Sequence, residues 1–180
     1  MRVISGSARG RRLKEPVGET IRPTSDKVKE AIFTIIQFDI ESRRVLDLFA
    51  GTGQLGIEAL SRGAASVVFV DSSRDSVKLI NDNLRHCKFS DQAAVYTTDA
   101  LSYLEYDEKF DVIFVDAPYE TQLASKALLK IIEFDKLNIN GIIIFELKTG
   151  TIMPGVTLPY ELIKEYKYGS TTIFKLTRRE

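Results

Sequence analysis

Five short apolar runs alternate with helical segments along this chain, and the alternation limits the folds open to it. The runs occupy residues 44–51, 66–71, 93–100, 110–117 and 141–147. Short apolar strands separated by helices are typical of βαβ units, in which helices cover both faces of a parallel sheet. The chain is therefore predicted to form a doubly wound α/β fold.

The helical segments carry recognisable start and stop residues. Thr24 or Ser25 is expected to cap a helix whose apolar residues recur at helical spacing through residue 36. Residues 54–63 form a second predicted helix, which Gly63 closes, and Ser72 or Ser73 begins a third that runs to about His86. Residues 160–177 differ, because two strand-like runs flank Gly169 without a helix between them. Such a hairpin must be antiparallel.

Length and composition are typical of an ordinary globular domain. The 180 residues are 44% hydrophobic and 28% charged, and no apolar stretch approaches the ~20 residues that span a membrane. The one cysteine, Cys87, has no partner for an internal disulfide, and no Cys/His cluster suggests a metal. We expect a cytoplasmic, monomeric protein without a metal.

Positive charge is concentrated at the start of the chain. The formal net charge is zero, yet residues 1–30 hold eight Lys/Arg and four Asp/Glu, a balance of +4. The first fourteen residues hold five bases and no acid: Arg2, Arg9, Arg11, Arg12 and Lys14. Such a segment favours an anionic partner, although a solvated terminus is the plain alternative. Residues 1–23 are predicted to form a basic arm or hairpin, and residues 24–180 the main domain.

An acid lies at or near four successive strand ends: Asp47, Asp71, Asp99 and Asp116. Ligands of open α/β sheets bind beyond the carboxyl ends of the strands. A single acid in a loop is usually a helix cap or a solvated residue. Four acids at corresponding positions indicate a binding site.

The glycine motif GTGQLG (Gly51, Gly53, Gly56) follows the first acid, and Asp71 lies 20 residues after Gly51. This pattern fits a dinucleotide loop, but a pyrophosphate is disfavoured by the carboxylate of Asp47. S-adenosylmethionine has no phosphate and carries two positive groups, so it suits the loop better. Asp47 would favour those charges, Asp71 would bind the ribose hydroxyls, and Asp99 would bind the adenine amino group.

The tetrapeptide Asp116-Ala117-Pro118-Tyr119 ends the strand at 110–117 and would face the methyl donor. The Asp116 carboxylate and the carbonyl of Ala117 or Pro118 can accept hydrogen bonds from a planar amine, which favours its nucleophilic, pyramidal form. Tyr119 can stack on a flat substrate. Taken alone, the four residues also fit a proline turn with a half-buried tyrosine.

With these motifs, the chain resembles class I S-adenosylmethionine-dependent methyltransferases, and more narrowly the RsmD family of small-subunit (16S) ribosomal RNA guanine-N2 methyltransferases. SGSARGRRLKEP, IRPTSDKVKEAIF and DLFAGTGQLGIEALSRGA carry the resemblance. It implies a seven-stranded sheet of order 3-2-1-4-5-7-6, and a contribution of Arg22, Pro23 and Thr24 to the cofactor pocket. The full expected set for S-adenosyl-L-methionine is Arg22, Thr24, Asp47, Phe49, Gly51, Gly53, Asp71, Ser72, Asp99 and Ala100. The arm would then bind ribosomal RNA phosphates, within a small ribosomal subunit or an assembly intermediate.

The sequence departs from the related motif at Ala117, where amino-methyltransferases of this type usually have a second proline. Alanine keeps the carbonyl, so an active enzyme with a looser site is expected. Three other functions stay open at this stage. The first is an amino-group methyltransferase that acts on DNA, a protein amide or a small molecule. The second is a dinucleotide-dependent oxidoreductase, and the third is a noncatalytic RNA-binding protein.

Overall fold

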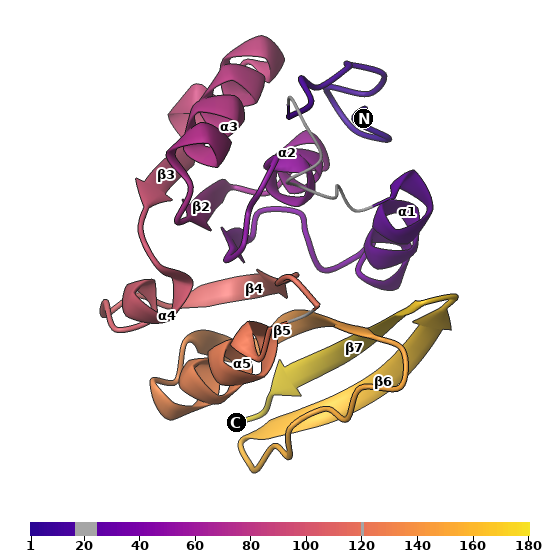
Figure 1. The fold of residues 1–180 in the computed structure, drawn as a ribbon, viewed down its shortest axis with the longest axis vertical. Coiled ribbons are helices and arrows are strands. Elements are labelled where there is room, and N and C mark those ends of the chain that lie inside the picture. Colours follow the sequence, from indigo (N-terminus) through magenta and orange to yellow (C-terminus); the bar gives the residue numbers. More distant parts are fainter. Residues whose placement is uncertain (17–24, 120) are drawn as a thin grey trace.

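The computed structural model describes residues 1–16, 25–119 and 121–180 (Figure 1). Its strands are β1 (Arg44–Asp47), β2 (Ser66–Asp71), β3 (Ala93–Thr97), β4 (Phe110–Val115), β5 (Leu137–Lys148), β6 (Tyr160–Tyr168) and β7 (Thr171–Arg178). Its helices are α1 (Asp26–Ile35), α2 (Gln54–Ser61), α3 (Arg74–Cys87), α4 (Ala100–Tyr103) and α5 (Leu123–Glu133), with a 3-10 turn η1 at Ser90–Gln92. Within the described ranges, no helix is long and apolar enough to cross a membrane.

The strands form one seven-stranded sheet in the order β3-β2-β1-β4-β5-β7-β6. The pairs among β1 to β5 are parallel, whereas β7 runs antiparallel to both β5 and β6. Figure 1 shows the β6–β7 hairpin along one edge of the sheet and β3 toward the other. The predicted fold class, strand order and antiparallel hairpin are confirmed.

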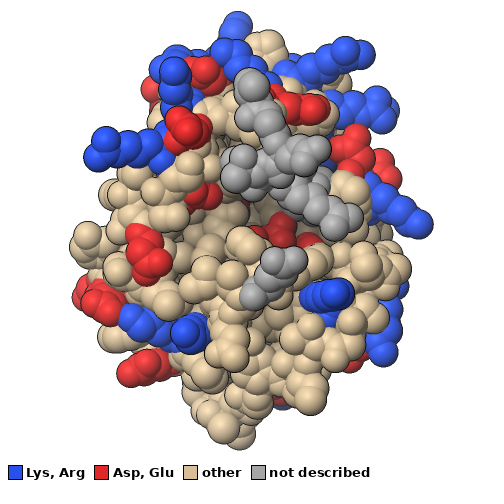
Figure 2. All heavy atoms as spheres, in the orientation of Figure 1, with Lys and Arg blue, Asp and Glu red and all other residues tan. Residues whose placement is uncertain are grey.

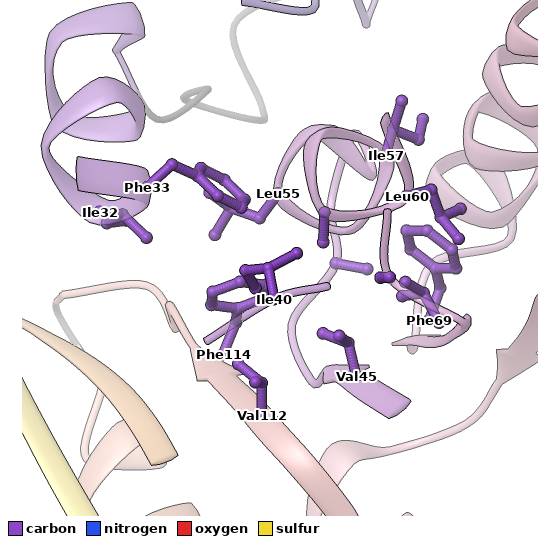
Figure 3. Close-up of a cluster of buried hydrophobic side chains, with 14 of the residues drawn as sticks. Ile32, Phe33, Ile40, Val45, Leu55, Ile57, Leu60, Phe69, Val112 and Phe114 are labelled. Atoms are coloured by element: carbon purple, nitrogen blue, oxygen red, sulfur yellow. The ribbon is translucent and has the colours of Figure 1, made fainter. Parts of the chain in front are cut away.

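The central strands are buried on both faces, and this explains their continuous apolar sequences. In β4, Val112 and Phe114 belong to one hydrophobic cluster, while Ile113 and Val115 belong to a second. Alternate residues of a strand point to opposite faces, so a strand between two helical layers needs both sets apolar. The first cluster includes side chains of α1 and α2 (Figure 3) and also of α3, and the second includes those of α4 and α5.

Strand β5 is longer than the predicted run at residues 141–147. It begins at Leu137, which pairs with Phe110, and the register then shifts before Ile142 pairs with Val112. Asn140 adopts a positive φ of 60° within this irregular stretch. Asparagine tolerates that conformation better than most residues. The polar residues of the bulge hid the first part of the strand from the apolar pattern.

The N-terminal residues pack against the domain. Val3, Ala8 and Leu13 are buried in the first cluster. An isolated antiparallel bridge joins Arg2 to Arg12, so the segment doubles back on itself as a small hairpin. The predicted boundary between residues 23 and 24 lies outside the described residues, and the division into arm and domain stays a prediction.

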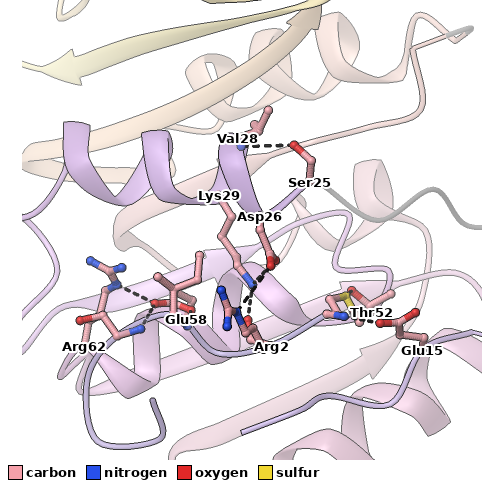
Figure 4. A network of polar contacts seen from close by, with 12 residues as sticks. Arg2, Glu15, Ser25, Asp26, Val28, Lys29, Thr52, Glu58 and Arg62 are labelled. Carbon is pink, nitrogen blue, oxygen red and sulfur yellow. Dashed lines mark hydrogen bonds and ion pairs between the residues drawn. The ribbon is translucent and has the colours of Figure 1, made fainter. Parts of the chain in front are cut away.

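Two buried charges hold this N-terminal hairpin in place (Figure 4). Glu58 on α2 accepts hydrogen bonds from the backbone N–H groups of Ile4 (2.8 Å) and Ser5 (2.9 Å), and also pairs with Arg62 (2.8 Å). On α1, the ammonium of Lys29 donates to the carbonyl of Arg2 (2.6 Å). Burial lowers the pKa of Lys29, while Glu58 and Asp26 oppose this change. Because buried charges are costly without partners, these contacts fix the hairpin against both helices.

We predict that Gly56→Ala destabilises the protein. A Cβ at Gly56 would lie 2.2 Å from a ring carbon of Phe69 on β2, so α2 and β2 would have to separate. Overpacking of this kind costs roughly 1–3 kcal/mol. The better helix propensity of alanine returns at most about 1 kcal/mol. Urea denaturation should give a lower midpoint with an unchanged m-value.

Gly155→Ala is the matched control, because a Cβ at Gly155 meets no atom within 4 Å. Its free energy of unfolding should stay within about 0.5 kcal/mol of the wild-type value. Equal stability of the Gly56 variant and the wild type would mean that α2 can move away from β2 at little cost.

Candidate functional site

Three aspartates meet at the carboxyl edge of the sheet, where β1, β2 and β4 end. Asp47 pairs with Phe69 of β2 and Phe114 of β4, its two neighbours in the sheet. Asp71 and Asp116 lie two residues beyond those partners, which puts them on the same side of the pleat as Asp47. Figure 2 shows acidic atoms near the centre of the face that it displays, with Lys and Arg along its upper rim and on both sides lower down.

The turn between β1 and α2 is held by Asp47. Its Oδ2 accepts a hydrogen bond from the backbone N–H of Gly56 (3.0 Å), in the first turn of the helix. Gly53 precedes the helix with a φ of +76°, a left-handed conformation that costs glycine little. The backbone of the turn therefore runs close to the carboxyl edge, with no side chain from its two glycines, Gly51 and Gly53.

Asp47 is buried without a counter-charge among the described residues. Burial raises the pKa of Asp47 to about 7; the N–H of Gly56 opposes this, and the negative charges of Asp116 and Asp71 add to it. A carboxyl group in this setting is close to half ionised at neutral pH. A cation bound beside it would favour the ionised form.

Asp71 connects the glycine turn to α3. One carboxylate oxygen accepts from the N–H of Gly51 (2.8 Å), and the other accepts from the N–H of Ser73 (2.8 Å). Ser73 caps α3, and Ser72 between them is exposed. Each carboxylate oxygen has a second acceptor site, so Asp71 retains capacity for hydroxyl donors of a ligand.

The structure describes three other predicted cofactor residues: Asp99, Ala100 and Phe49. Asp99 caps α4 by accepting from the N–H of Ser102 (3.0 Å), and Ala100 next to it is buried. Phe49 is partly buried against the second hydrophobic cluster. Arg22, Pro23 and Thr24 lie outside the described residues.

The two candidate carbonyl acceptors of the tetrapeptide after β4 differ in their exposure and hydrogen bonding. Pro118 is exposed, and its carbonyl accepts from the N–H (3.2 Å) and the hydroxyl (2.8 Å) of Thr121. Ala117 is buried, and its carbonyl takes part in none of the hydrogen bonds found among the described residues. Of the two carbonyls, that of Ala117 is therefore better placed to join Asp116 as an acceptor for a substrate.

Tyr119 returns to the sheet through its hydroxyl. The hydroxyl donates to Oε1 of Glu146 on β5 and lies 2.6 Å from the hydroxyl oxygen of Thr171 on β7. Burial and the hydrogen bond to Glu146 raise the pKa of Tyr119 above its usual value. Tyr119 as a residue is 37% exposed while its hydroxyl is anchored.

Glu146 and Thr171 belong to this site, and sequence reasoning missed both. Glu146 follows Phe145, the partner of Val115, so it lies beside Asp116 in the sheet. Burial and, next, the negative charge of Asp116 raise the pKa of Glu146 to about 8. An acid inside the apolar run GIIIFEL was a signal for Glu146. Thr171 lies in a hairpin where polar and apolar residues are mixed, so no residue pattern marks it as part of the site.

The five bases of the N-terminal hairpin differ in their contacts. Arg11 donates to the carbonyl of His86 (2.6 Å), Lys14 pairs with Asp82 (3.0 Å), and Arg2 lies 3.8 Å from Asp26. Arg9 and Arg12 are exposed, and their side chains make no ion pair with any residue that the structure describes. These two arginines are the ones most available to an anionic partner.

The chain matches known proteins over nearly its whole length. Residues 1–176 match the model of a family described as "Conserved hypothetical protein 95". Ribosomal RNA small subunit methyltransferase D of Haemophilus influenzae is 37% identical over 150 residues, 81% of this chain and 78% of that protein. The Escherichia coli protein of the same name is 31% identical over 181 residues, 100% of this chain and 90% of that one. The solved structure of yhhF from Escherichia coli has a TM-score of 0.91 and 29% identity, covering 99% of this chain and 98% of that one.

We predict that Asp47→Asn stabilises the protein above neutral pH. The native pKa of Asp47, about 7, lies above the ~3.9 of an unfolded chain, so the native state binds more protons between these values. The contribution of this group to stability therefore falls as pH rises from about 4 to 7. Asparagine keeps an acceptor for the N–H of Gly56 and has no charge to bury.

Thermal or urea unfolding at pH 5 and pH 8 measures this difference. At pH 8 the variant should gain roughly 1–3 kcal/mol over the wild type, and at pH 5 the two should be closer. Asp91→Asn, at an exposed acid in η1, should leave the pH dependence unchanged. A constant difference between Asp47→Asn and the wild type at both pH values would contradict a raised pKa.

Proposed function

The chain belongs to the RsmD family of ribosomal RNA small-subunit methyltransferases, and we propose that it transfers a methyl group from S-adenosyl-L-methionine to the exocyclic N2 of a guanine in small-subunit ribosomal RNA. One observation carries this proposal: Asp116 lies beside Asp47, so an acceptor for an amine and an anionic pocket for a cation share one edge of the sheet. A dinucleotide-dependent oxidoreductase or a noncatalytic RNA-binding protein would have no use for an amine acceptor beside a cation pocket.

The acids at this edge fit a cationic cofactor better than a dinucleotide. S-adenosyl-L-methionine would supply an electrophilic methyl group on a positively charged sulfur. The buried carboxyl of Asp47 has no counter-charge among the described residues, and its raised pKa indicates how much a cation would favour its ionised form. A pyrophosphate at the same place would be repelled. These properties support S-adenosyl-L-methionine as the cofactor.

Each residue has a proposed role in holding the cofactor. Asp47 faces its positive groups, Asp71 accepts from the ribose hydroxyls, and Asp99 accepts from the adenine amino group. The backbone of Gly51 and Gly53 lets the amino-acid end approach. The remaining proposed contacts come from Arg22, Thr24, Phe49, Ser72 and Ala100.

Asp116 and Ala117 would act on the nucleophile. S-adenosyl-L-methionine would supply the methyl group: a C–N bond would form as the methyl–sulfur bond breaks and leaves its electron pair on sulfur, and the amine would release an N–H proton. The N2 lone pair of guanine is delocalised into the ring, so acceptors for both N–H groups favour the pyramidal nitrogen that attacks. The Asp116 carboxylate and the Ala117 carbonyl supply those acceptors, and Asp116 takes the proton.

The half-exposed ring of Tyr119 would stack on the base. Stacking of a base on an aromatic ring contributes roughly 1–3 kcal/mol. A guanine reaches such a site only when it is unpaired or rotated out of its helix. The basic residues of the N-terminal hairpin would bind RNA phosphates, and a chain of 180 residues offers little surface to read a large RNA. We therefore propose a folded ribonucleoprotein, a small subunit or its precursor, as the substrate.

Transfer of labelled methyl from S-adenosyl-L-methionine to small ribosomal subunits lacking base methylation tests this function. Nucleoside analysis should find the label as N2-methylguanosine. Binding of the cofactor should raise the melting temperature, whereas nicotinamide dinucleotides should not. Label on another nucleoside would correct the target atom. No label on RNA, with label on DNA, protein or small-molecule amines, would overturn the RNA assignment.

We predict that Asp116→Asn lowers kcat by about 10²–10³-fold, because the acceptor of the amine proton loses its charge. Ala117→Pro is the matched change at the neighbouring residue. It keeps the carbonyl, and the residue before Pro118 already favours extended conformations, so its effect should be much smaller. The rate of methyl transfer in single-turnover kinetics with saturating cofactor measures the effect of each variant. Full activity of the Asp116 variant would exclude the proposed role.

We also predict that the double variant Arg9→Gln, Arg12→Gln binds the RNA substrate more weakly. Removing two phosphate contacts should flatten the slope of log affinity against log salt by about 2. Arg11→Gln is the control, since Arg11 already donates to the carbonyl of His86. Its salt slope should change less, while its stability falls. A double variant with the wild-type slope would show that these arginines do not contact RNA.

A further inference from the structure

Glu146 is a buried acid in the middle of an apolar strand, and neither the fold nor the steps above require a carboxyl group there. Its neighbours along β5, Phe145 and Leu147, are buried in the second hydrophobic cluster. The Glu146 side chain is 5% exposed. Burial of an ionised carboxylate is expensive, so an apolar residue would serve the strand better. A buried acid at the edge of a proposed active site indicates a role in that site.

A directed chain of hydrogen bonds ends on Glu146. Tyr119 donates its hydroxyl hydrogen to Oε1 of Glu146, which leaves the phenol oxygen to accept from the hydroxyl of Thr171 at 2.6 Å. The chain therefore runs from β7 through the loop after β4 to β5. It fixes one oxygen of the Glu146 carboxyl and the hydroxyl end of Tyr119.

The second carboxyl oxygen of Glu146, Oε2, has no hydrogen-bond donor as a neighbour among the described residues, unlike Oε1. Oε2 is buried, and no hydrogen-bond donor from the described residues reaches it. The carboxyl group of Asp116, the next residue after the Val115–Phe145 pair on the neighbouring strand, interacts with the carboxyl group of Glu146. Two carboxylates hold only acceptors, so they can be joined in such a place only when one of them carries a proton. The shared-proton pair of an aspartic protease is a known case of this arrangement.

We propose that Glu146 is a positioning residue for methyl transfer, a neutral carboxylic acid that donates its proton to Asp116 through Oε2 and holds Tyr119 through Oε1. This inference rests on the proposed function. The pair then carries one negative charge, which lies on Asp116 and faces the amine. The Asp116 carboxylate would accept hydrogen bonds from the N–H groups of the base, and its contact with Glu146 would hold it in a single orientation.

The arrangement gives each carboxyl a separate task. Glu146 lies deeper, which favours its protonated form, whereas Asp116 is only partly buried, so the proposal assigns the single negative charge to Asp116. The proton released by the amine passes to Asp116, which makes the pair neutral until the product leaves and the proton returns to solvent. The same glutamic acid orients Tyr119, so the acceptor and the stacking surface are fixed by one side chain.

The inference implies a pH limit on the reaction. The titratable groups that face Glu146 are Asp116 at the end of β4 and Tyr119 in the loop that follows, and β7 contributes the neutral Thr171. No Lys or Arg of the described chain appears among the groups acting on this carboxyl. When the proton leaves at alkaline pH, two carboxylates repel each other, and Asp116 loses its fixed position.

The test compares Glu146→Gln with Glu146→Ala in single-turnover methyl transfer from pH 6 to pH 9.5. At saturating cofactor the wild-type rate should fall above about pH 8, where the buried acid ionises. Glutamine donates to Asp116 and accepts from Tyr119 without titrating, so its rate should stay near the wild-type value and lose the alkaline fall. Alanine removes both contacts and should lower the rate on the order of 10²-fold at every pH. Glu133→Gln, at an exposed acid of α5, is the control and should keep the wild-type profile.

Titration of the ¹³C-labelled Glu146 carboxyl by NMR gives a readout that needs no activity. Glu146→Gln identifies its signal, which should be that of a protonated acid at pH 7. Ionisation of Glu146 near pH 4 would overturn the inference, as would an unchanged alkaline fall in the glutamine variant or full activity of the alanine variant. If the wild type transfers no methyl to any acceptor, the proposed function fails; the titration then decides separately whether the proton is shared.

Discussion

The hydrogen bond from the N–H of Gly56 to Asp47 fixes the geometry on which the rest of the site depends. It ties the end of β1 to the first turn of α2 and thereby sets the path of the intervening turn. The N–H of Gly51 in that turn then reaches Asp71 at the end of β2, and Asp71 in turn binds the start of α3. Hydrogen bonds from backbone N–H groups to two carboxylates thus help to hold two strands and two helices together. The side-chain oxygens that remain are presented toward one edge of the sheet.

The carboxyl groups at this edge differ in how their negative charge is balanced. Asp71 accepts hydrogen bonds from two backbone N–H groups. Asp47 has one N–H and deep burial, so it lies near the balance between its two forms. Glu146 has a tyrosine hydroxyl and another carboxyl as neighbours, and it favours the protonated form. One edge thus holds a carboxyl group bound by two backbone N–H groups and two buried carboxyl groups, Asp47 and Glu146, whose pKa values are raised. This difference follows from depth of burial and from the count of donors.

Much of the fold was predictable because the central strands are buried on both faces. The apolar runs located β1 to β4, and Gly169 located the hairpin of β6 and β7. The strand order came instead from family resemblance, since spacing alone does not fix which strands are neighbours. The acids of the glycine turn were predictable because strand ends converge at one edge.

Other parts of the site and the core depend on contacts between distant segments. Glu146 contacts Tyr119 across 27 residues, and Thr171 contacts it across 52. Lys29 and Glu58 look like surface charges in a helical pattern, yet both are fully buried under the N-terminal hairpin. A sequence pattern assigns a charged residue to the solvent face of its helix, and only the packed neighbour overrides that assignment.

The packing of the N-terminal hairpin has a consequence for the order of folding. Its contacts span large sequence separations: 54 residues from Ile4 to Glu58, and 75 from Arg11 to His86. Closing such loops costs entropy before any contact forms, and contacts of this range slow folding. The first residues of the chain have no docking surface until α2 and α3 are in place. The earliest part of the polypeptide is therefore among the last to reach its final position, and Val3, Ala8 and Leu13 stay open to solvent until then.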